Sequence, residues 1–180
     1  MNYYFLAASL PTLSLDAPPP FSCQRFRALC AEHMSAKDLQ TLDSLAEPLT
    51  TPSENSFVQE WRRREIHLRN AIARTRALRL QIEAAPYLRE APGYEAAIEH
   101  AVSEAYSRTS PLERELAIDR FRWRQLDELA GLNPFSLHAL LAYALKLTLV
   151  ERWASMTEKM GTARANEVVQ SQPQAQLEPA

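Results

Sequence analysis

Glycine is scarce in this chain of 180 residues, since only Gly93, Gly131 and Gly161 occur and they stand far apart. Phosphate-binding loops and dinucleotide-binding turns need clustered glycines, because backbone N–H groups must come close to the phosphate. The chain also has no His-Glu-x-x-His, Cys-x-x-Cys or Gly-x-Ser-x-Gly motif. These absences argue against nucleotide-binding and hydrolytic enzymes. We therefore expect a non-catalytic protein with no catalytic residue, no cofactor and no metal ion.

Cysteine is equally rare, and Cys23 and Cys30 lie seven residues apart in a segment with a helical pattern. Seven residues of helix rise about 10 Å, whereas a disulfide joins Cα atoms at most about 7 Å apart. We therefore expect two free thiols, as is typical of cytoplasmic proteins. The first residues are apolar without a preceding basic stretch, so we interpret them as part of the fold and not as a signal peptide.

The chain lacks both a strong charge of one sign and a long hydrophobic run. Its formal net charge is −2, which creates no overall field to attract nucleic acid or acidic lipid. The most apolar segment, residues 137–150, contains His138 and Lys146 and is shorter than the roughly 20 residues that span a bilayer. We expect no membrane span. A helix that is apolar nearly all the way round must instead be covered by other protein on most sides.

Helix-capping signals are what the chain has in abundance. Ser110-Pro-Leu-Glu113 and Thr51-Pro-Ser-Glu54 are capping boxes with proline at the first helical position. Asn133 followed by Pro134 predicts another helix start, and Gly131 predicts the end of the helix before it. Together with the hydrophobic periodicity, these signals predict helices over residues 22–33, 35–46, 52–84, 94–107, 111–130 and 134–158. The predicted fold class is therefore all-α, a helical bundle of about six helices.

The remaining segments set the predicted domain limits. Residues 86–93 are rich in proline and form the clearest linker. Residues 2–10 are compatible with either a short N-terminal strand or a helix, because the run is too short for periodicity to decide. We predict a single helical domain over residues 1–158. The polar, glutamine-rich stretch 159–180 is predicted to be a disordered C-terminal tail.

The long helix predicted over residues 52–84 carries the main polar feature of the chain. Its apolar residues form two sectors, which predicts packing against two neighbours. Arg62, Arg69 and Arg76 recur every seven residues along a line between the sectors. Three interpretations stay open at this point: a solvated face whose arginine stems cover apolar surface, a protein interface, or a nucleic-acid surface.

The interface interpretation names five candidate partner-contact residues. Trp61 and the three arginines are of the types enriched at interaction hot spots. Asn70 is either an ordinary surface residue or a group that positions the backbone of a partner. The candidates are Trp61, Arg62, Arg69, Asn70 and Arg76.

The last two predicted helices, 111–130 and 134–158, are expected to form a helical hairpin. Asp119 lies three residues before Arg122, so we predict an exposed ion pair of small energy between them. Lys146 shares a stripe with apolar side chains and must either extend to solvent or find an acidic partner.

Three segments of the chain occur together in a suggestive order: Tyr3-Tyr-Phe-Leu-Ala-Ala-Ser-Leu-Pro11, the stretch from Trp61 to Ala77, and Asn133-Pro-Phe through Trp153. Together they resemble an uncharacterised bacterial family, domain of unknown function 2764. The genes of that family typically sit in operons for V-type (A/V-type) ATPases.

The resemblance implies a structural or accessory subunit of a bacterial V-type ATPase. Its partners would be other ATPase subunits, at the central rotor stalk and the membrane ring, and it would lie in the cytoplasm, peripheral to the inner membrane through the complex. The helical layout is also similar to a reduced form of the all-helical subunit called C in archaeal-type and d in eukaryotic enzymes. The alternatives are a helical adaptor or regulatory protein outside the ATPase, or an RNA or anion binder.

Overall fold

The computed structural model describes residues 3–156, which contain seven α-helices, two short 3₁₀ turns and no strand. This confirms the all-α class that the sequence predicts. The elements are α1 (Tyr4–Ser9), α2 (Cys23–His33), α3 (Ala36–Asp43), η1 (Ser44–Ala46), α4 (Ser56–Leu80), η2 (Ala85–Tyr87), α5 (Ala96–Ser107), α6 (Pro111–Ala130) and α7 (Leu137–Ser155).

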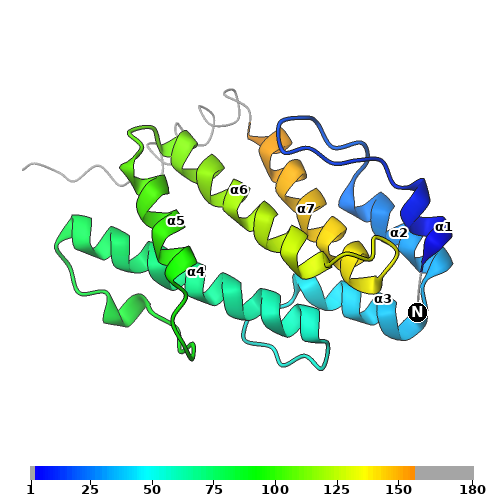
Figure 1. The fold of residues 1–180 in the computed structure, drawn as a ribbon, viewed down its shortest axis with the longest axis horizontal. Coiled ribbons are helices and arrows are strands. Elements are labelled where there is room, and N and C mark those ends of the chain that lie inside the picture. Colours follow the sequence, from blue (N-terminus) through cyan, green and yellow to red (C-terminus); the bar gives the residue numbers. More distant parts are fainter. Residues whose placement is uncertain (1–2, 157–180) are drawn as a thin grey trace, which may run out of the picture.

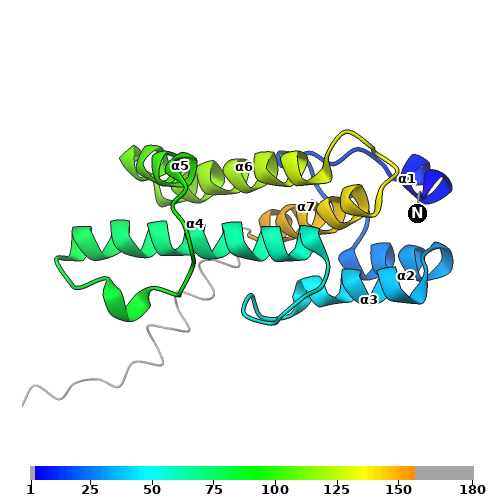
Figure 2. The ribbon, with the colours of Figure 1, turned by 60° about the horizontal axis from the view of Figure 1, so that its bottom comes forward.

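The helices pack as an elongated bundle around α6 and α7, which form the expected antiparallel hairpin (Figure 1). The longest helix, α4, runs along the long dimension of the molecule and packs against both α5 and α6. Turning the molecule shows that α7 lies between α6 and the pair formed by α2 and α3 (Figure 2). The small helix α1 packs on α2 at the end of the bundle.

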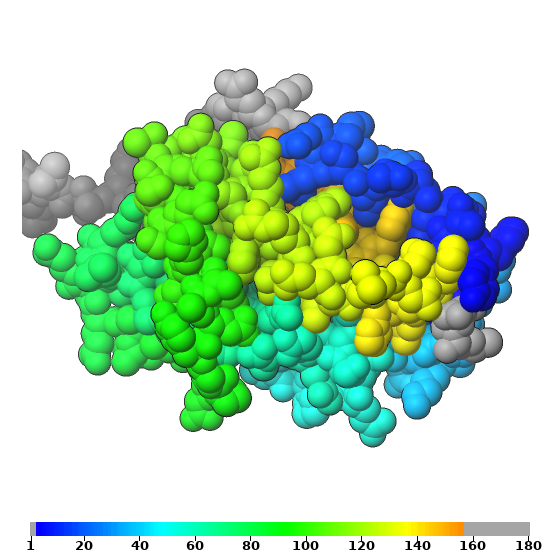
Figure 3. Space-filling view, viewed as in Figure 1, coloured from blue at the N-terminus to red at the C-terminus, as the bar shows by residue number. Residues whose placement is uncertain are grey.

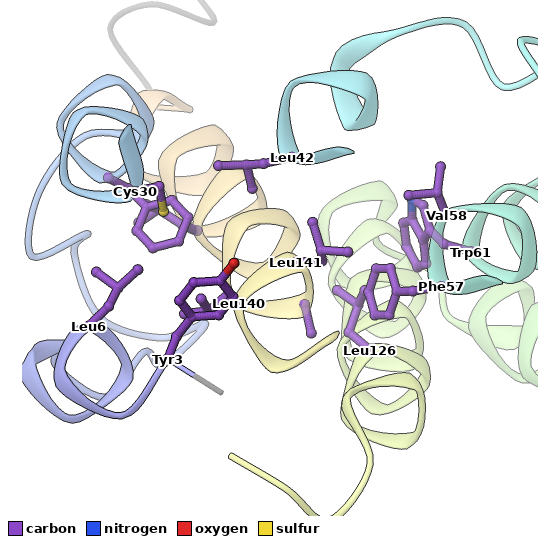
Figure 4. Close-up of a cluster of buried hydrophobic side chains, with 13 residues drawn as sticks. Tyr3, Leu6, Cys30, Leu42, Phe57, Val58, Trp61, Leu126, Leu140 and Leu141 are labelled. Carbon is purple, nitrogen blue, oxygen red and sulfur yellow. The ribbon is translucent and has the colours of Figure 1, made fainter. Parts of the chain in front are cut away.

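One hydrophobic core joins α1, α2, α3, α6 and α7 to the first half of α4 (Figure 4). Leu140 and Leu141 of α7 are buried at its centre, with Phe57 and Trp61 of α4 on one side. Leu6 of α1 closes the other side, next to α2. Because this cluster draws on six helices, α4 is an integral part of the fold.

A second core lies between the second half of α4, α5 and α6. Leu68 and Ala71 of α4 face Ile98 and Val102 of α5, and Phe121 of α6 completes the cluster. The prediction that this long helix contacts two neighbours is confirmed, and the neighbours are α5 and α6.

The apolar helix α7 is covered on most sides, as its composition requires. Packing against α6 was expected from the sequence, but α2 and α3 also cover it. Phe26 of α2 and Tyr143 of α7 bring their rings to 5.1 Å between centroids, which anchors this side. Most of the apolar surface of α7 is therefore covered within the chain, and Leu145 and Leu149 remain partly exposed.

The helix starts show which capping signals are used. Ser110 caps α6 as predicted, through its hydroxyl and the Glu113 N–H. The start predicted at Asn133 is wrong, because α7 begins at Leu137 with Ser136 as its N-cap. The Asn133 side chain instead accepts a hydrogen bond from the Phe135 N–H, 3.0 Å away. This local turn competes with helix initiation, as asparagine side chains often do.

Both predicted ends of the long helix also need correction. The cap is Asn55, whose side-chain oxygen accepts from the N–H groups of Phe57 and Val58, and the capping box at residues 51–54 lies in the preceding loop. The helix ends at Leu80 because Gln81 adopts a left-handed conformation with φ of 56°. Glycine or asparagine usually marks this position, so the sequence carries no clear stop signal here.

The ambiguous N-terminal segment contains a helix. The N–H of Tyr3 donates to the Phe135 carbonyl at 2.7 Å, which places α1 against the α6–α7 connection. The linker predicted over residues 86–93 includes the end of η2 and is otherwise without helix. The predicted tail, residues 159–180, lies outside the described residues. Among residues 3–156, no helix combines the length and apolarity that crossing a bilayer requires.

The two cysteines are free, and both thiols have a raised pKa. Burial raises the pKa of Cys30 to about 12. Burial and a neighbouring Glu151 carboxylate raise the pKa of Cys23 to about 11. Only the thiolate reacts with disulfide reagents. We therefore expect both thiols to react at least about tenfold more slowly at pH 8 in the folded chain than in urea, measured as the rate of thionitrobenzoate release. Equal rates in the two conditions would contradict this.

Candidate functional site

A buried charge network connects α4, α6 and α7. Asp119 of α6 is completely buried and accepts hydrogen bonds from three donors. Its Oδ1 lies 2.8 Å from the guanidinium of Arg122, and its Oδ2 accepts from Arg152 and, at 2.7 Å, from the indole of Trp153. The prediction of an exposed pair of small energy is therefore wrong. The pairing with Arg122 is present, but the tertiary structure encloses it.

Arg122 links this carboxylate to a second buried one on α4. Its Nε and Nη2 donate to both oxygens of Glu65, at 3.0 and 2.9 Å. Arg69 donates to the same carboxylate at 2.9 Å. Burial lowers the pKa of Arg122, but the charges and hydrogen bonds of Glu65 and Asp119 outweigh it, so the pKa rises above its ordinary value. This guanidinium therefore stays charged at every pH at which the protein folds.

The network has three guanidinium groups for two carboxylates. The network therefore has one positive charge in excess. Arg69 and Arg152 present this charge at the surface, since their side chains are 53% and 43% exposed. A partly exposed guanidinium that is held in place by a buried carboxylate is a well-ordered donor for an acidic group from outside. The network therefore supports a positive surface as well as the fold.

Two cavities of about 490 and 550 Å³ meet at this network. Arg69, Arg122 and Arg152 line both of them. The cavities lie on either side of these arginines, with α4 forming one wall and α7 contributing to the other. We call the two adjacent cavities together the α4–α7 groove.

The two ends of the α4–α7 groove are apolar. The first end is lined by Ile72, Ala77 and Leu80 of α4 and by Ile118 of α6, with Arg76 at its edge. Leu80 is 68% exposed there, and the neighbouring Ile82 and Tyr87 are exposed as well. The second end is lined by the loop after η1 and by Leu145 and Leu149 of α7. Apolar pockets on both sides of a charged centre are suited to an amphipathic ligand.

Three of the five candidate contact residues line the α4–α7 groove. Arg69 stands at its centre, and Arg76 stands at the first end with a side chain that is 59% exposed. The Arg76 Nε also donates to the Tyr106 hydroxyl at 2.7 Å, which orients the guanidinium. Trp61 lines the second end but is buried, so its ring serves mainly the hydrophobic core.

The other two candidates are buried in contacts within the chain and lie outside the groove. Arg62 donates to the carbonyl oxygens of Ser44, at 2.5 Å, and of Thr51. Asn70 donates to the Arg89 carbonyl at 2.8 Å and accepts from the Arg89 N–H at 2.9 Å. The interpretation of Asn70 as a surface residue is wrong. It does position a backbone, but the backbone is that of its own chain.

Asn70 is the main polar anchor of the segment between η2 and α5. Replacing it by alanine leaves the N–H and carbonyl of Arg89 without their partner, which costs about 1–3 kcal/mol where such groups are buried. We expect the Arg89 amide in N70A to exchange its hydrogen at least about tenfold faster, measured by NMR. T75A, at another partly buried site on α4, is the control and should leave this amide unchanged. Unaltered exchange in N70A would show that other contacts hold the segment.

Two groups of the network, Glu65 and Arg152, carry no signal in the sequence, and Asp119 and Arg122 were expected only as an exposed pair. Each lies at ordinary helical spacing, so no local pattern distinguishes it from a solvent-exposed charge. A usable signal was that Asp119 lies three residues after Leu116 and seven before Leu126, which places its carboxylate on the helix face of the buried Leu126.

A separate recess lies on the face shown in Figure 3, where α7 is visible between the N-terminal segment and α6. Lys146 lines this recess, pairs with Asp127 of α6 and lies 4.7 Å from the centre of the Trp123 ring. Of the two alternatives expected for Lys146, extension to solvent or an acidic partner, the structure shows the acidic partner. Because its charge is matched by Asp127 and by the aromatic face, this recess offers a weaker recognition site than the α4–α7 groove.

The two buried carboxylates at the α4–α7 groove are fully engaged in hydrogen bonds within the chain. Each oxygen of Glu65 and Asp119 already accepts from an arginine or tryptophan donor, so neither carboxylate has an oxygen left without a donor. Arginine does not give up its proton in proteins. Among residues 3–156, no group of three or more histidine, cysteine or acidic residues is placed to hold a metal ion.

The sequence model of one protein family, described as "Protein of unknown function (DUF2764)", matches residues 1–48 and 99–173. No curated protein and no solved structure was found to match. The match covers α1, α2, α3, α6, α7 and most of α5. It leaves out residues 49–98, which contain α4 and all five candidate contact residues. The α7 side of the groove therefore lies inside the matched segments and the α4 wall outside them.

Proposed function

The chain belongs to the family "Protein of unknown function (DUF2764)", and we propose from this premise that it is a non-catalytic accessory subunit of a bacterial V-type ATPase. In this role it acts through protein–protein contacts, lies peripheral to the inner membrane within the complex, and joins the central rotor stalk to the membrane ring. The operon context of the family, given above as part of the resemblance, supplies the link to the ATPase.

The observation that carries the proposal is the α4–α7 groove. Arginine is enriched at protein interfaces, and large apolar side chains such as those at the end of α4 are unusual on a surface without a partner. The groove sits on a bundle whose helices share two buried cores, so its walls are held in place before a partner arrives. A preformed surface of this kind loses little conformational entropy on binding.

The occupied carboxylates in the groove support a role without catalysis. A general base needs a free acceptor in reach of its substrate, and a general acid needs a proton that it can release. Glu65 and Asp119 already accept from arginine and tryptophan donors, and the guanidinium groups retain their protons. The centre of the groove is therefore better suited to holding a charged partner than to transforming one.

Co-purification from cells tests the proposal. The full chain, tagged at its N-terminus and expressed from its own locus, is isolated with gentle detergent, and the partners are quantified by mass spectrometry. We expect ATPase subunits in a fixed ratio to the chain, retained through a wash at moderate salt. An unrelated helical protein with the same tag is the control. Complete absence of ATPase subunits, with the ATPase intact in the same extract, would overturn the proposal.

A further inference from the structure

The α4–α7 groove has the dimensions of a helix-binding site. Its α4 wall runs from Trp61 to Leu80, which is about 28 Å at 1.5 Å per residue. Such a length accommodates about five turns of a second helix. Because the two cavities share Arg69, Arg122 and Arg152 as lining residues, an occupant that crosses these arginines would contact apolar side chains at both ends.

The charge of the α4–α7 groove is opposite in sign to that of the whole chain. Five arginines line it against three carboxylates, and a fourth carboxylate, Asp119, is buried against Arg122 and Arg152. This leaves one positive charge in excess, whereas the complete sequence has a formal net charge of −2. The arginines are Arg69, Arg76, Arg89, Arg122 and Arg152, and the carboxylates are Glu47, Glu65 and Glu115. The local excess of positive charge selects an occupant with acidic groups near its middle.

The apolar ends of the groove decide which class of acidic occupant fits. A nucleic acid would place phosphates on the arginines but would leave Leu80 and Ile82 against a charged backbone. The one aromatic ring exposed in this region, Tyr87, is a minimal stacking platform. An amphipathic helix satisfies both features, because apolar residues at helical spacing cover the ends while acidic residues between them reach the arginines.

We infer that the α4–α7 groove docks an amphipathic helix of a partner protein, with apolar residues at both ends of its contact face and at least one carboxylate in the middle. The inference rests on the proposed function to the extent that the partner would be a subunit of the ATPase. The chemistry of the groove specifies the helix whichever complex supplies it.

A matched pair of double variants of the full chain tests the docking surface. The groove variant is R76E/L80D, which reverses one charge at the first end and makes the exposed Leu80 acidic. The control is R120E/L78D, which makes the same chemical changes at exposed side chains that do not line the groove, Leu78 being 80% exposed. Thermal melts of both variants should lie within a few degrees of the parent, since all four positions are exposed.

The first readout is the amount of ATPase subunits that co-purify with each variant. We expect at least a tenfold loss for R76E/L80D and less than a twofold change for R120E/L78D. If the parent chain captures ATPase subunits and R76E/L80D captures them equally well, the docking inference fails while the proposed function stands.

The second readout does not depend on the ATPase. A photo-crosslinking amino acid is placed at position 80 of the full chain in cells, and the crosslinked segment is sequenced. A segment of another protein with apolar residues at helical spacing and an intervening acid supports the inference, even if that protein is outside the ATPase. A crosslink to RNA, to a second copy or to residues 157–180 of the same chain, or the lack of any crosslink, overturns it.

Discussion

Replacing Asp119 by alanine is expected to lower the free energy of unfolding by about 3–5 kcal/mol, because removing one partner of a buried ion pair leaves the other charges uncompensated. Asp119 is completely buried and accepts from Arg122, Arg152 and Trp153. Without Asp119, the Nη1 group of Arg122 and the indole N–H of Trp153 lose their acceptor inside the bundle. Urea unfolding followed by tryptophan fluorescence measures the change.

The matched control for this prediction is D16A. Asp16 is exposed and reaches Arg120 only at 3.5 Å, so its pair is worth about 1 kcal/mol or less. A third variant, D119N, keeps the shape of the side chain and removes the charge, and it should fall between the other two. If D119A were as stable as D16A, the network would contribute nothing to stability. Asp119 would then not be the group that holds the guanidinium groups of the groove in place.

Replacing Phe57 by alanine is expected to cost about 3–5 kcal/mol, since a buried phenylalanine leaves a large cavity when it is truncated. Phe57 is in the first turn of α4 and is buried beside Leu126 and Leu141 (Figure 4). Its ring also lies 5.6 Å from the ring of His138 on α7. The same urea titration measures the effect.

The F57A variant tests whether α4 belongs to the same cooperative unit as α6 and α7. The family model matches α6 and α7 but not α4. If α4 belongs to this unit, α4 and α7 unfold together, and the midpoint of the F57A transition falls for every spectroscopic probe. F5A is the control: Phe5 is exposed on α1, and its loss should cost less than about 1 kcal/mol. A second, separate transition for α4 would contradict a single cooperative bundle.

Features that depend on interactions between neighbouring residues were predicted correctly more often than features that depend on distant parts of the chain. The start of α6 was predicted correctly because its capping residue and its first-turn proline are adjacent in the chain. The start of α7 was predicted too early because two candidate caps, Asn133 and Ser136, lie three residues apart, and propensity does not rank them. The end of α4 was predicted too late because Gln81, and not a glycine, adopts the left-handed conformation that ends the helix.

In the candidate site, too, the features set by neighbouring residues were predicted and those set by distant segments were not. The seven-residue repeat pointed to α4 and to two residues, Arg69 and Arg76, that line the α4–α7 groove with exposed side chains. It could not show that Arg62 is enclosed by the loop that carries Ser44 and Thr51, because that loop is brought over α4 only by folding. Nor could it show that Asn70 is used by the main chain of Arg89.

The all-α class, the hairpin of α6 and α7 and the arginine-rich helix could all be predicted from the amino-acid sequence, because periodicity, capping and composition are properties of neighbouring residues. Which charges are buried depends on how the helices pack. Glu65, Asp119 and Arg152 are far apart in the chain and look like ordinary surface residues in their own helices. They become one network, and the floor of a groove, because α4, α6 and α7 pack with those particular faces together.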